Sequence, residues 1–408
     1  MGNYKFYKEI KEKNKRLSND KVRTSSVRVE FLEKEDFDLI NEEMIESKDL
    51  IPLAEIKEDF FPSASSYNQN NELSILSNSN LSKEINATPL LKNSDMENWI
   101  DKIKIIGITG SRGKSTTALI IHNYFQSIGK KSILYSSIMI DSPVSYIRKE
   151  EPSEIPIKND ATLLDIFEEG YYYDADYIVI EVNESTIEKG LIEGLNFFIR
   201  ALTNISPFHN EEQFSPDEYI RLKESFFKNI PNEEESICVM GLTGPFTRED
   251  FNRLIKLNNR PKITYGSKYI CEVRNADYSN IDILLHGLAS SLNGLDFKVR
   301  VKDKSYDFNT NIIFPYNAFN FVCAIGILEA AGVFDPVRFN QVIKNMVIPG
   351  REEVIRINSR TIIIGLHLLP VLESLKPFKD SKEINNIKGL LVGEKNFLLK
   401  FIIVKKVR

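Results

Sequence analysis

Residues 103–131 read IKIIGITGSRGKSTTALIIHNYFQSIGKK, and this stretch determines the fold class. Its first part, IKIIGIT, is apolar and short, as expected of a buried strand. Its last part spaces Leu119, Ile120, Tyr124 and Phe125 as they would lie in a helix. Glycines occupy the segment between the two. The stretch therefore predicts a strand, a glycine-rich turn and a helix in direct succession.

The same alternation continues along the following residues. Apolar runs that predict strands take turns with runs that predict helices, an order typical of a parallel sheet covered by helices. The predicted strands are 131–138, 175–182, 197–206 and 236–242, and the predicted helices are 161–173 and 216–230. Residues 262–312 carry short alternating segments such as GLDFKVRV, which favour a small antiparallel sheet. The predicted fold is α/β, a P-loop-type parallel sheet flanked by helices, with this antiparallel sheet attached.

Composition divides the chain into three regions. Residues 1–100 are rich in Lys, Glu, Asn and Ser, include a linker-like run at 63–71, and predict at most a small, loosely packed unit. Residues 101–348 hold the alternating elements and, after Pro315, a long apolar helix. Residues 349–408 contain the strand-like runs SRTIIIGL and KGLLVGE. We expect them to form a truncated C-terminal α/β domain, because few residues follow Arg351.

Charge and cysteine usage exclude several classes of protein. The 408 residues carry a formal net charge of -5, which disfavours nucleic acid or an anionic membrane as the main partner. No apolar run reaches the roughly 18 residues of a membrane span. Three cysteines without a C-x-x-C pair indicate neither a disulfide framework nor a zinc site. We expect a soluble, cytoplasmic protein.

The glycine-rich turn predicts a phosphate site. It comprises Gly110, Ser111, Arg112, Gly113, Lys114, Ser115 and Thr116. Glycines let backbone N–H groups approach a phosphate closely, the following helix N-terminus favours an anion, and Lys114 adds a positive charge. Ile108 stands where the full P-loop pattern has glycine, so the turn has the shorter G-x-x-G-K-[ST] form. The alternative is an ordinary turn beside a surface lysine.

Five further stretches follow the turn in a characteristic order: IVIEVNES, ALTNISPFH, EYIRLKESFF, YNAFN and PGREE. With them, residues 103–375 resemble the Mur ligases, and 101–348 resemble their central ATP-binding domain. The stretches KITYGS and ADYSNIDI are most similar to the UDP-N-acetylmuramoyl-tripeptide synthetases of this family. The resemblance implies an ATP-dependent ligase of the cell-wall peptide type. It would join a carboxylate, such as that of a UDP-muramoyl peptide, to an amino acid through an acyl phosphate.

The resemblance also implies roles for individual residues. Lys114 and the turn would hold the β- and γ-phosphates of ATP. Magnesium would lie near Ser115, Glu181, His209 and a carbamylated Lys223, with Glu184 as a substitute or assistant. Asn317 and Asn320 would contact adenine, and Arg351 would reach the nucleotide. The alternatives are a solvated acid for Glu181, a surface lysine for Lys223, an ordinary polar loop residue for His209, a helix cap for Asn317 and an exposed turn residue for Arg351.

Several positions depart from the family pattern. Phe208 replaces an aspartate before His209, Gly365 replaces an aspartate that would hold the ribose, and residues 183–185 replace Ser-Ser-His. These changes favour an alternative, a non-catalytic ATP-binding scaffold or regulator. A further alternative is a ligase resembling poly-γ-glutamate synthetase, which shares Arg-Gly-Lys-Ser in the loop.

Overall fold

The computed structural model describes residues 3–17 and most of the chain from 98 to 406. Within that second part it leaves out 143–145, 149–156, 158, 206–213, 229, 231–235, 243–252, 269–270, 272–279, 350, 358–359, 366–383 and 393–398. The linker-like run at 63–71 lies outside the described residues. For residues 351–406 the description concerns the backbone.

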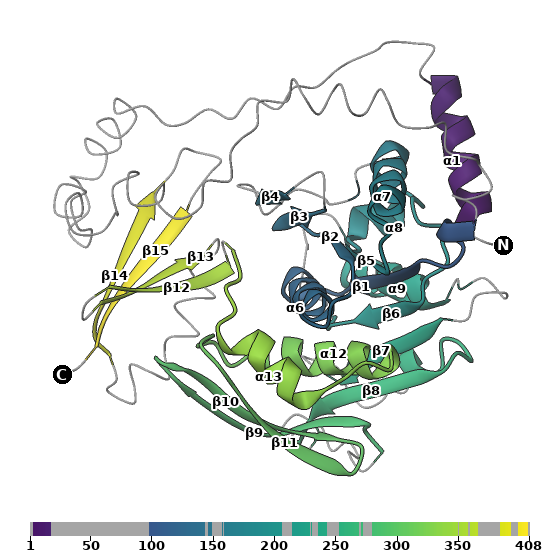
Figure 1. The fold of residues 1–408 in the computed structure, drawn as a ribbon. Coiled ribbons are helices and arrows are strands. Elements are labelled where there is room, and N and C mark those ends of the chain that lie inside the picture. Colours follow the sequence, from purple (N-terminus) through teal and green to yellow (C-terminus); the bar gives the residue numbers. More distant parts are fainter. Residues whose placement is uncertain are drawn as a thin grey trace, which may run out of the picture.

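A large mixed sheet forms the centre of the described structure (Figure 1). Its order is β11-β10-β9-β8-β7-β6-β1-β5-β2-β3-β4. The strands are β1 Lys104–Thr109, β2 Ser132–Tyr135, β3 Met139–Asp141, β4 Tyr146–Arg148, β5 Tyr177–Glu181, β6 Ile199–Leu202, β7 Ile237–Leu242, β8 Lys262–Ser267, β9 Ile283–Ser291, β10 Gly294–Val301 and β11 Lys304–Thr310. From β2 through β5, β1, β6, β7 and β8 to β9, neighbouring strands run parallel. The predicted parallel sheet is confirmed.

The antiparallel part is smaller than the sequence suggested. β10 pairs antiparallel with β9 and β11, as predicted for this region. However, β8 continues the parallel sheet beside β7, so residues 262–267 do not belong to the antiparallel part. The direction of a strand depends on its partner in space, which an alternating pattern does not specify.

Helices cover both faces of the sheet. They are α1 Asn3–Leu17, α6 Lys114–Ser127, α7 Asp160–Tyr173, α8 Glu184–Glu188, α9 Pro216–Lys228, α12 Asn317–Ala330 and α13 Pro336–Lys344. Along β1, Ile106 and Ile108 belong to the core cluster that contains α6, α12 and α13, whereas Ile105 belongs to the cluster that contains α1, α7 and α9. Side chains alternate between the faces of a strand, so both faces of β1 are buried and the strand is apolar throughout.

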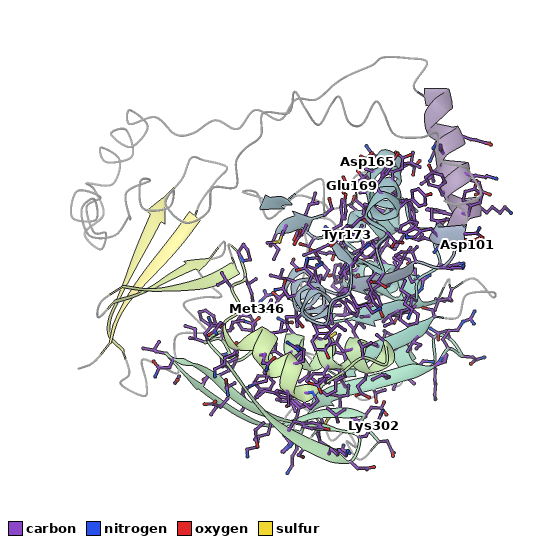
Figure 2. All side chains as sticks on the ribbon, viewed as in Figure 1. Asp101, Asp165, Glu169, Tyr173, Lys302 and Met346 are labelled. Atoms are coloured by element: carbon purple, nitrogen blue, oxygen red, sulfur yellow. The ribbon has the colours of Figure 1, made fainter. Side chains whose placement is uncertain are left out.

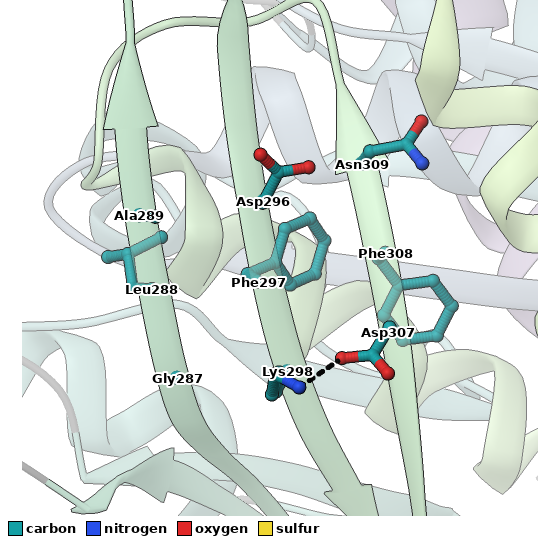
Figure 3. Close-up of a pocket in the computed structure, with 9 residues that line it drawn as sticks. All are labelled: Gly287, Leu288, Ala289, Asp296, Phe297, Lys298, Asp307, Phe308 and Asn309. Carbon is teal, nitrogen blue, oxygen red and sulfur yellow. Dashed lines mark ion pairs between the residues drawn. The ribbon is translucent and has the colours of Figure 1, made fainter.

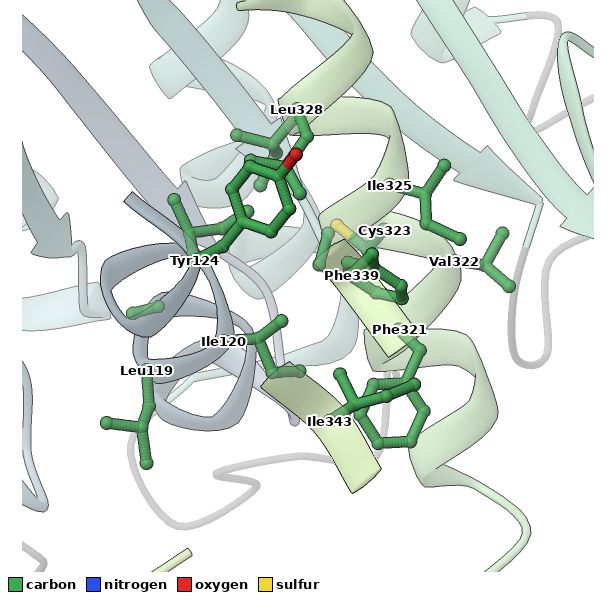
Figure 4. Packing of buried hydrophobic residues seen from close by; sticks show 14 of the residues in the cluster. Leu119, Ile120, Tyr124, Phe321, Val322, Cys323, Ile325, Leu328, Phe339 and Ile343 are labelled. Atoms are coloured by element: carbon green, nitrogen blue, oxygen red, sulfur yellow. The ribbon is translucent and has the colours of Figure 1, made fainter. Parts of the chain in front are cut away.

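Helix α6 is fixed by packing against α12 and α13 (Figure 4). Residues 115–122, together with Tyr124 and Phe125, are buried, as expected of a helix enclosed on most sides. The Tyr124 hydroxyl donates to the Val333 carbonyl oxygen at 2.6 Å, just beyond α12. The N-terminus of α6, which follows the glycine-rich turn, is therefore held by a rigid core.

The N-terminal helix α1 packs into the main core, although the sequence predicted at most a loosely packed unit for residues 1–100 as a whole. Its residues Tyr4, Phe6, Tyr7 and Ile10 are buried in the cluster that also contains α7. The backbone N–H of Tyr4 donates to Asp101 at 2.9 Å, a residue labelled in Figure 2. This part of residues 1–100 thus belongs to the main core.

The C-terminal residues form a separate sheet with the order β12-β13-β15-β14. Its strands are β12 Arg351–Ile357, β13 Arg360–Gly365, β14 Ile384–Val392 and β15 Leu399–Lys406, and each pair is antiparallel. The two predicted strands correspond to β13 and β14. The described residues of this region contain strands and no helix. Elsewhere too, no described helix has both the length and the apolar character to cross a membrane.

Candidate functional site

The turn between β1 and α6 has the conformation that its glycines allow. Gly110 has a φ of 142° and Gly113 a φ of 82°, both in the region that favours glycine. A Cβ atom on Gly110 would collide with the Thr203 hydroxyl, and one on Gly113 would collide with the Asn320 side chain. Both glycines are therefore required by conformation and by space.

The end of β6 holds the turn in place. The Ser111 N–H donates to the Asn204 carbonyl oxygen at 2.9 Å, and the Arg112 N–H donates to the Asn204 side chain at 3.1 Å. In return, Asn204 Nδ2 and Thr203 Oγ1 donate to the Arg112 carbonyl oxygen at 2.8 and 2.6 Å. This role of Thr203 and Asn204 was not predicted from the sequence. The available signal was two polar side chains directly after a buried strand.

The first turn of α6 presents backbone donors at the glycine-rich turn. Gly113 is the N-cap, and no side chain caps the helix there. A helix N-terminus carries partial positive charge and unsatisfied N–H groups, which suit an anion such as phosphate. Lys114 Nζ donates back to the Gly110 and Ser111 carbonyl oxygens at 2.9 and 3.3 Å, so its charge stays over the turn.

Ser137 connects Ser115 with Glu181. The Ser115 and Ser137 hydroxyls lie 2.9 Å apart, and the Ser137 N–H donates to Glu181 Oε2 at 2.8 Å. Glu181 is only 2% exposed, so the alternative of a solvated acid is wrong. The side-chain oxygen of Asn183, two residues later, is buried without a hydrogen-bond partner.

This donor set fits magnesium. Mg²⁺ prefers oxygen ligands and usually combines one or two carboxylates with substrate phosphates and water. Glu181 and Ser115 supply oxygens next to the predicted phosphate position, and Asn183 offers an unused acceptor. In the described part of the chain, no group of three or more His, Cys, Asp or Glu residues is arranged so that it could hold a metal ion. The oxygens of Glu181, Ser115 and Asn183 therefore suit a cation that is shared with a bound phosphate.

Lys223 on α9 is completely buried, so the alternative of a surface lysine is wrong. Its Nζ lies 2.7 Å from Glu184 Oε1 and donates to the Thr109 hydroxyl, at the end of β1, at 3.0 Å. Burial and the charge of Lys114 lower the pKa of Lys223 to about 7, although Glu184 opposes the shift. A neutral amine near pH 7 is what the predicted carbamate requires. That carbamate remains a prediction.

Glu184 on α8 contacts two residues of α9. Besides Lys223, its Oε1 accepts from the Tyr219 hydroxyl at 2.9 Å, and that hydroxyl also lies 2.9 Å from Ser111 Oγ in the turn. Burial alone would raise the pKa of Glu184, but Lys114 and Lys223 outweigh it and lower the pKa to about 2. Burial and the charge of Glu184 raise the pKa of the Tyr219 phenol above its ordinary value. At neutral pH the site thus contains a carboxylate and a protonated phenol.

The two predicted adenine contacts lie at the N-terminus of α12. Asn320 packs against Gly113, and its Nδ2 donates to Asn317 Oδ1 at 2.9 Å. The helix begins at Asn317, its N-cap is Tyr316, and no side chain caps it, so the capping alternative for Asn317 is wrong. Asn317 Nδ2 is buried without a hydrogen-bond partner. Asn320 thus lies against the turn, and Asn317, which pairs with it, retains an unused donor.

Four positions singled out from the sequence are not described at the side-chain level. Phe208 and His209 lie outside the described residues. Arg351 is the first residue of β12, and Gly365 is the last residue of β13, but only their backbone is described. Their proposed contacts remain predictions.

A pocket of about 370 Å³ opens elsewhere, on β9, β10 and β11 (Figure 3). Across it Lys298 pairs with Asp307 at 3.0 Å, and both side chains are well exposed. In the sheet, β6, β7 and β8 separate these strands from β1. None of the predicted site residues lines this pocket.

Comparison with known proteins gives this geometry a context. Residues 108–328, more than half of the chain, match the Mur ligase middle domain. The UDP-N-acetylmuramoyl-L-alanyl-D-glutamate--2,6-diaminopimelate ligase of Aquifex aeolicus is 24% identical over 264 residues, covering 65% of this chain and 50% of that ligase. The chain spans about half the length of such curated relatives.

Solved structures agree on the fold. A diaminopimelate ligase of the same name has a TM-score of 0.54 at 20% identity, covering 70% of this chain and 55% of the other. An FPGS–AMPPCP complex has a TM-score of 0.50 at 16% identity, covering 72% and 76%. At these identities the likeness shows a shared fold.

Proposed function

The chain belongs to the Mur ligase family, and on this premise we propose that it catalyses ATP-dependent formation of an amide bond between a carboxylate and an amino acid. The observation that carries the proposal is the convergence at one sheet edge. A glycine-rich turn, an uncapped helix N-terminus, Lys114 and the buried Glu181 meet there, joined through Ser115 and Ser137. Each of these groups has a use in phosphoryl transfer.

ATP is the proposed phosphoryl donor. The N–H groups at the start of α6 would bind its terminal phosphates, and Lys114 would neutralise their charge. Asn317 and Asn320 would contact adenine, since amides both donate and accept. The AMPPCP bound in the FPGS structure supports a nucleotide at this fold. Ser115 and Glu181 would hold magnesium, which supplies further positive charge to the phosphate oxygens. His209 and Arg351 remain predicted contacts of the metal and the nucleotide.

The chemistry divides into two displacements. A carboxylate oxygen of the acceptor attacks the γ-phosphorus, the bond to the β-phosphate oxygen breaks, and ADP leaves. The amine of the amino acid then attacks the carbonyl carbon, and the C–O bond to phosphate breaks as the amide forms. The amine loses its proton to water. The turn and Lys114 act mainly by positioning and by charge stabilisation.

The proposed acceptor is a UDP-muramoyl peptide, and the second substrate is an amino acid. The name of the Aquifex aeolicus relative, a UDP-N-acetylmuramoyl-L-alanyl-D-glutamate--2,6-diaminopimelate ligase, supports this choice. These substrates require contacts that lie outside the turn described above.

The test is phosphate release from ATP and magnesium, with a panel of UDP-muramoyl peptides and amino acids. Lys114→Ala should lower turnover by at least about 100-fold, because it removes a charge that stabilises the transition state. Lys130→Ala, just beyond the C-terminal end of α6, is the matched control, since Lys130 pairs with Asp176 at the surface. Equal loss in both variants, or none in either, would contradict the proposal.

A second candidate is a nucleotide-binding protein without turnover. Gly365, which ends β13 where the family pattern has aspartate, carries no side chain that could hold a ribose and favours this candidate. The same assay separates the two. Tight magnesium-dependent ATP binding without phosphate release, on every acceptor, would establish the second candidate.

A further inference from the structure

His122 is a buried histidine that the proposed reaction does not use. It lies on α6 and is 0% exposed, and both of its ring nitrogens have polar partners. Nε2 lies 3.0 Å from Asp141 Oδ2, at the end of β3, and Nδ1 lies 3.1 Å from Ser132 Oγ, at the start of β2. The imidazole therefore joins the helix that follows the phosphate turn to the two strands β2 and β3 (Figure 1).

The contact between His122 and Asp141 has a defined direction. A carboxylate only accepts, so Nε2 is the donor to Asp141. Nδ1 accepts from the Ser132 hydroxyl when the ring is neutral and donates to it when the ring is charged, so both contacts persist in either form. Because the imidazole is fully buried, the loss of a partner would leave an unsatisfied polar group in the core, which is costly. The link between α6 and the strands is therefore independent of the charge on His122.

Strands β2 and β3 form a hairpin, and His122 holds its base through Ser132 and Asp141. At the tip, the backbone N–H and the hydroxyl of Ser136 both donate to the Met139 carbonyl oxygen, at 3.0 and 2.9 Å. Strand β3 is three residues long and pairs with β2 through two of them. Such a short pairing gives β3 little support, so the bond from α6 is an important further anchor.

The tip of the hairpin reaches the candidate metal position. Ser137 follows Ser136 in the turn, its N–H donates to Glu181 Oε2 at 2.8 Å, and its hydroxyl lies 2.9 Å from Ser115 Oγ. The four residues of β2 separate this tip from the base of the hairpin, a length of roughly 13 Å. A tilt of about 5° at the base would therefore move the tip by about 1 Å. Mg²⁺ requires near-ideal octahedral geometry, so such a shift would weaken its binding.

We propose that His122 is a positioning residue of the metal site, which holds the β2–β3 hairpin through Asp141 so that Ser137 orients Glu181 beside Ser115. The inference rests on the function proposed above, in which Glu181 and Ser115 hold magnesium. Helix α6 then has two roles in the site. Its N-terminus presents the phosphate donors, and His122, further along the helix, fixes the carboxylate that faces them.

The first experiment measures hydrogen exchange of the Ser137 amide in the protein without ligands. Asp141→Ala removes the acceptor and should accelerate this exchange at least about fivefold, as expected for the loss of one hydrogen bond. Asp141→Asn keeps an oxygen that accepts from Nε2 and should stay near the wild-type rate. Asp307→Ala, which removes an exposed partner of Lys298 on β11, is the matched control. Because 25% of the Asp141 side chain is exposed, we expect all three variants to fold.

Substitutions of His122 identify which of its two contacts matters. The side-chain nitrogen of Gln lies about as far from the backbone as Nε2 and can donate to Asp141, whereas the amide of Asn reaches only as far as Nδ1, toward Ser132. His122→Gln should therefore preserve slow exchange at Ser137, and His122→Asn should accelerate it. His286→Asn, at an exposed histidine on β9, is the control. Equal exchange rates in His122→Gln and His122→Asn would contradict the role of the Asp141 contact.

The second experiment measures ATP affinity by calorimetry, once with magnesium and once with EDTA. Without metal, Asp141→Ala should bind ATP as the wild type does, because the turn and Lys114 are unchanged. The increase in affinity that magnesium produces should be at least about fivefold smaller in Asp141→Ala, a milder loss than the roughly 10- to 100-fold typical when a direct partner of a metal ligand is removed. Asp141→Asn should restore the increase. A purely structural role would lower the folded fraction and leave the ratio of the two affinities unchanged.

The two experiments separate this inference from the proposed function. If the wild-type protein shows no magnesium-dependent affinity for ATP, the proposed function fails, and the exchange rates of the Ser137 amide still decide whether His122 holds the hairpin. Wild-type exchange at Ser137 in Asp141→Ala would overturn the inference. So would a wild-type effect of magnesium on ATP affinity in that variant.

Discussion

Gly113 shows how much the phosphate turn depends on single residues. Its φ of 82° is strained for any residue with a side chain, and Asn320 fills the space where a Cβ atom would lie. Gly129, at the other end of α6, has a similar φ of 75°, but no atom lies within 4 Å of a Cβ atom there. Comparing a substitution at Gly113 with one at Gly129 therefore distinguishes the effect of backbone strain from that of steric collision.

Gly113→Ala should weaken magnesium-ATP binding by more than about tenfold, because the collision displaces either the turn or Asn320. Gly129→Ala should cost about 1 kcal/mol of stability through strain alone and leave affinity unchanged. Calorimetry and urea unfolding measure the two quantities. Asn320→Ala combined with Gly113→Ala should recover stability relative to Gly113→Ala. Equal affinities in the two single variants would contradict the prediction.

The acid stability of the site should depend on Glu184. Its pKa is lowered from 4.5 to about 2 by Lys114 and Lys223 against the effect of burial. A lowered folded-state pKa adds stability above the unfolded value, and this contribution is lost as pH falls through the folded value. The difference in free energy of unfolding between wild type and Glu184→Gln should therefore be a few kcal/mol near pH 5 and shrink toward pH 2. Urea unfolding across that range measures it, with Glu188→Gln as the control. A difference that stays constant would refute the assignment.

The sequence predicted those residues of the candidate site whose positions depend on local structure. Lys114, Ser115 and Glu181 follow from the pattern of strand, turn and helix, since a strand end fixes where its next residues lie. It did not identify how Glu184, Tyr219 and Asn204 are connected. Tyr219 and Asn204 lie about a hundred residues beyond the turn, and their contacts depend on how strands and helices pack. Periodicity carries no information about such contacts.

At the scale of elements, α1 was the least expected feature. The average composition of residues 1–100 is polar, which obscured a helix whose Tyr4, Tyr7 and Ile10 recur every three residues. The Asn3 side chain also pairs with the backbone of Asn196 in both directions, at 2.7 and 3.3 Å. Residues 3–17, considered apart from the rest of this region, show the periodicity of a helix. By contrast, the long apolar elements were predicted well, because a strand that is buried on both faces is apolar at nearly every position of its sequence.

Tyr7→Ala should destabilise the protein by about 3 kcal/mol, as expected for removing a large buried aromatic side chain. Tyr7 is 3% exposed, its ring lies 6.2 Å from that of Phe167, and its hydroxyl donates to Glu168 at 3.0 Å. Glu9→Ala, on the exposed side of the same helix, is the control. Chemical unfolding followed by circular dichroism measures both. A loss below about 1 kcal/mol would mean that α1 is not part of the core.

At the scale of the whole molecule, nucleotide binding should raise the stability of the folded state. A ligand that binds only the folded protein stabilises it by about 2.7 kcal/mol at 100 times its Kd. Magnesium-ATP should therefore raise the melting temperature of the wild-type protein and of Lys130→Ala, but not that of Lys114→Ala. Calorimetric melting with and without ligand is the measurement. An equal shift in all three proteins would mean that ATP binds away from the turn.

The bonds between the phosphate turn and β6 limit how the turn can be transplanted. The backbone N–H groups of Ser111 and Arg112 donate to the backbone and the side chain of Asn204, respectively. The space beside Gly113 is occupied by Asn320 from α12. A peptide or graft carrying residues 103–131 alone would keep the sequence of the turn but lose the contacts with Asn204 and Asn320. Its loop would no longer be preorganised and would have to bear the entropic cost of ordering on each binding event. Transplanting the phosphate turn to another scaffold would therefore require the end of β6 and the N-terminus of α12 as well.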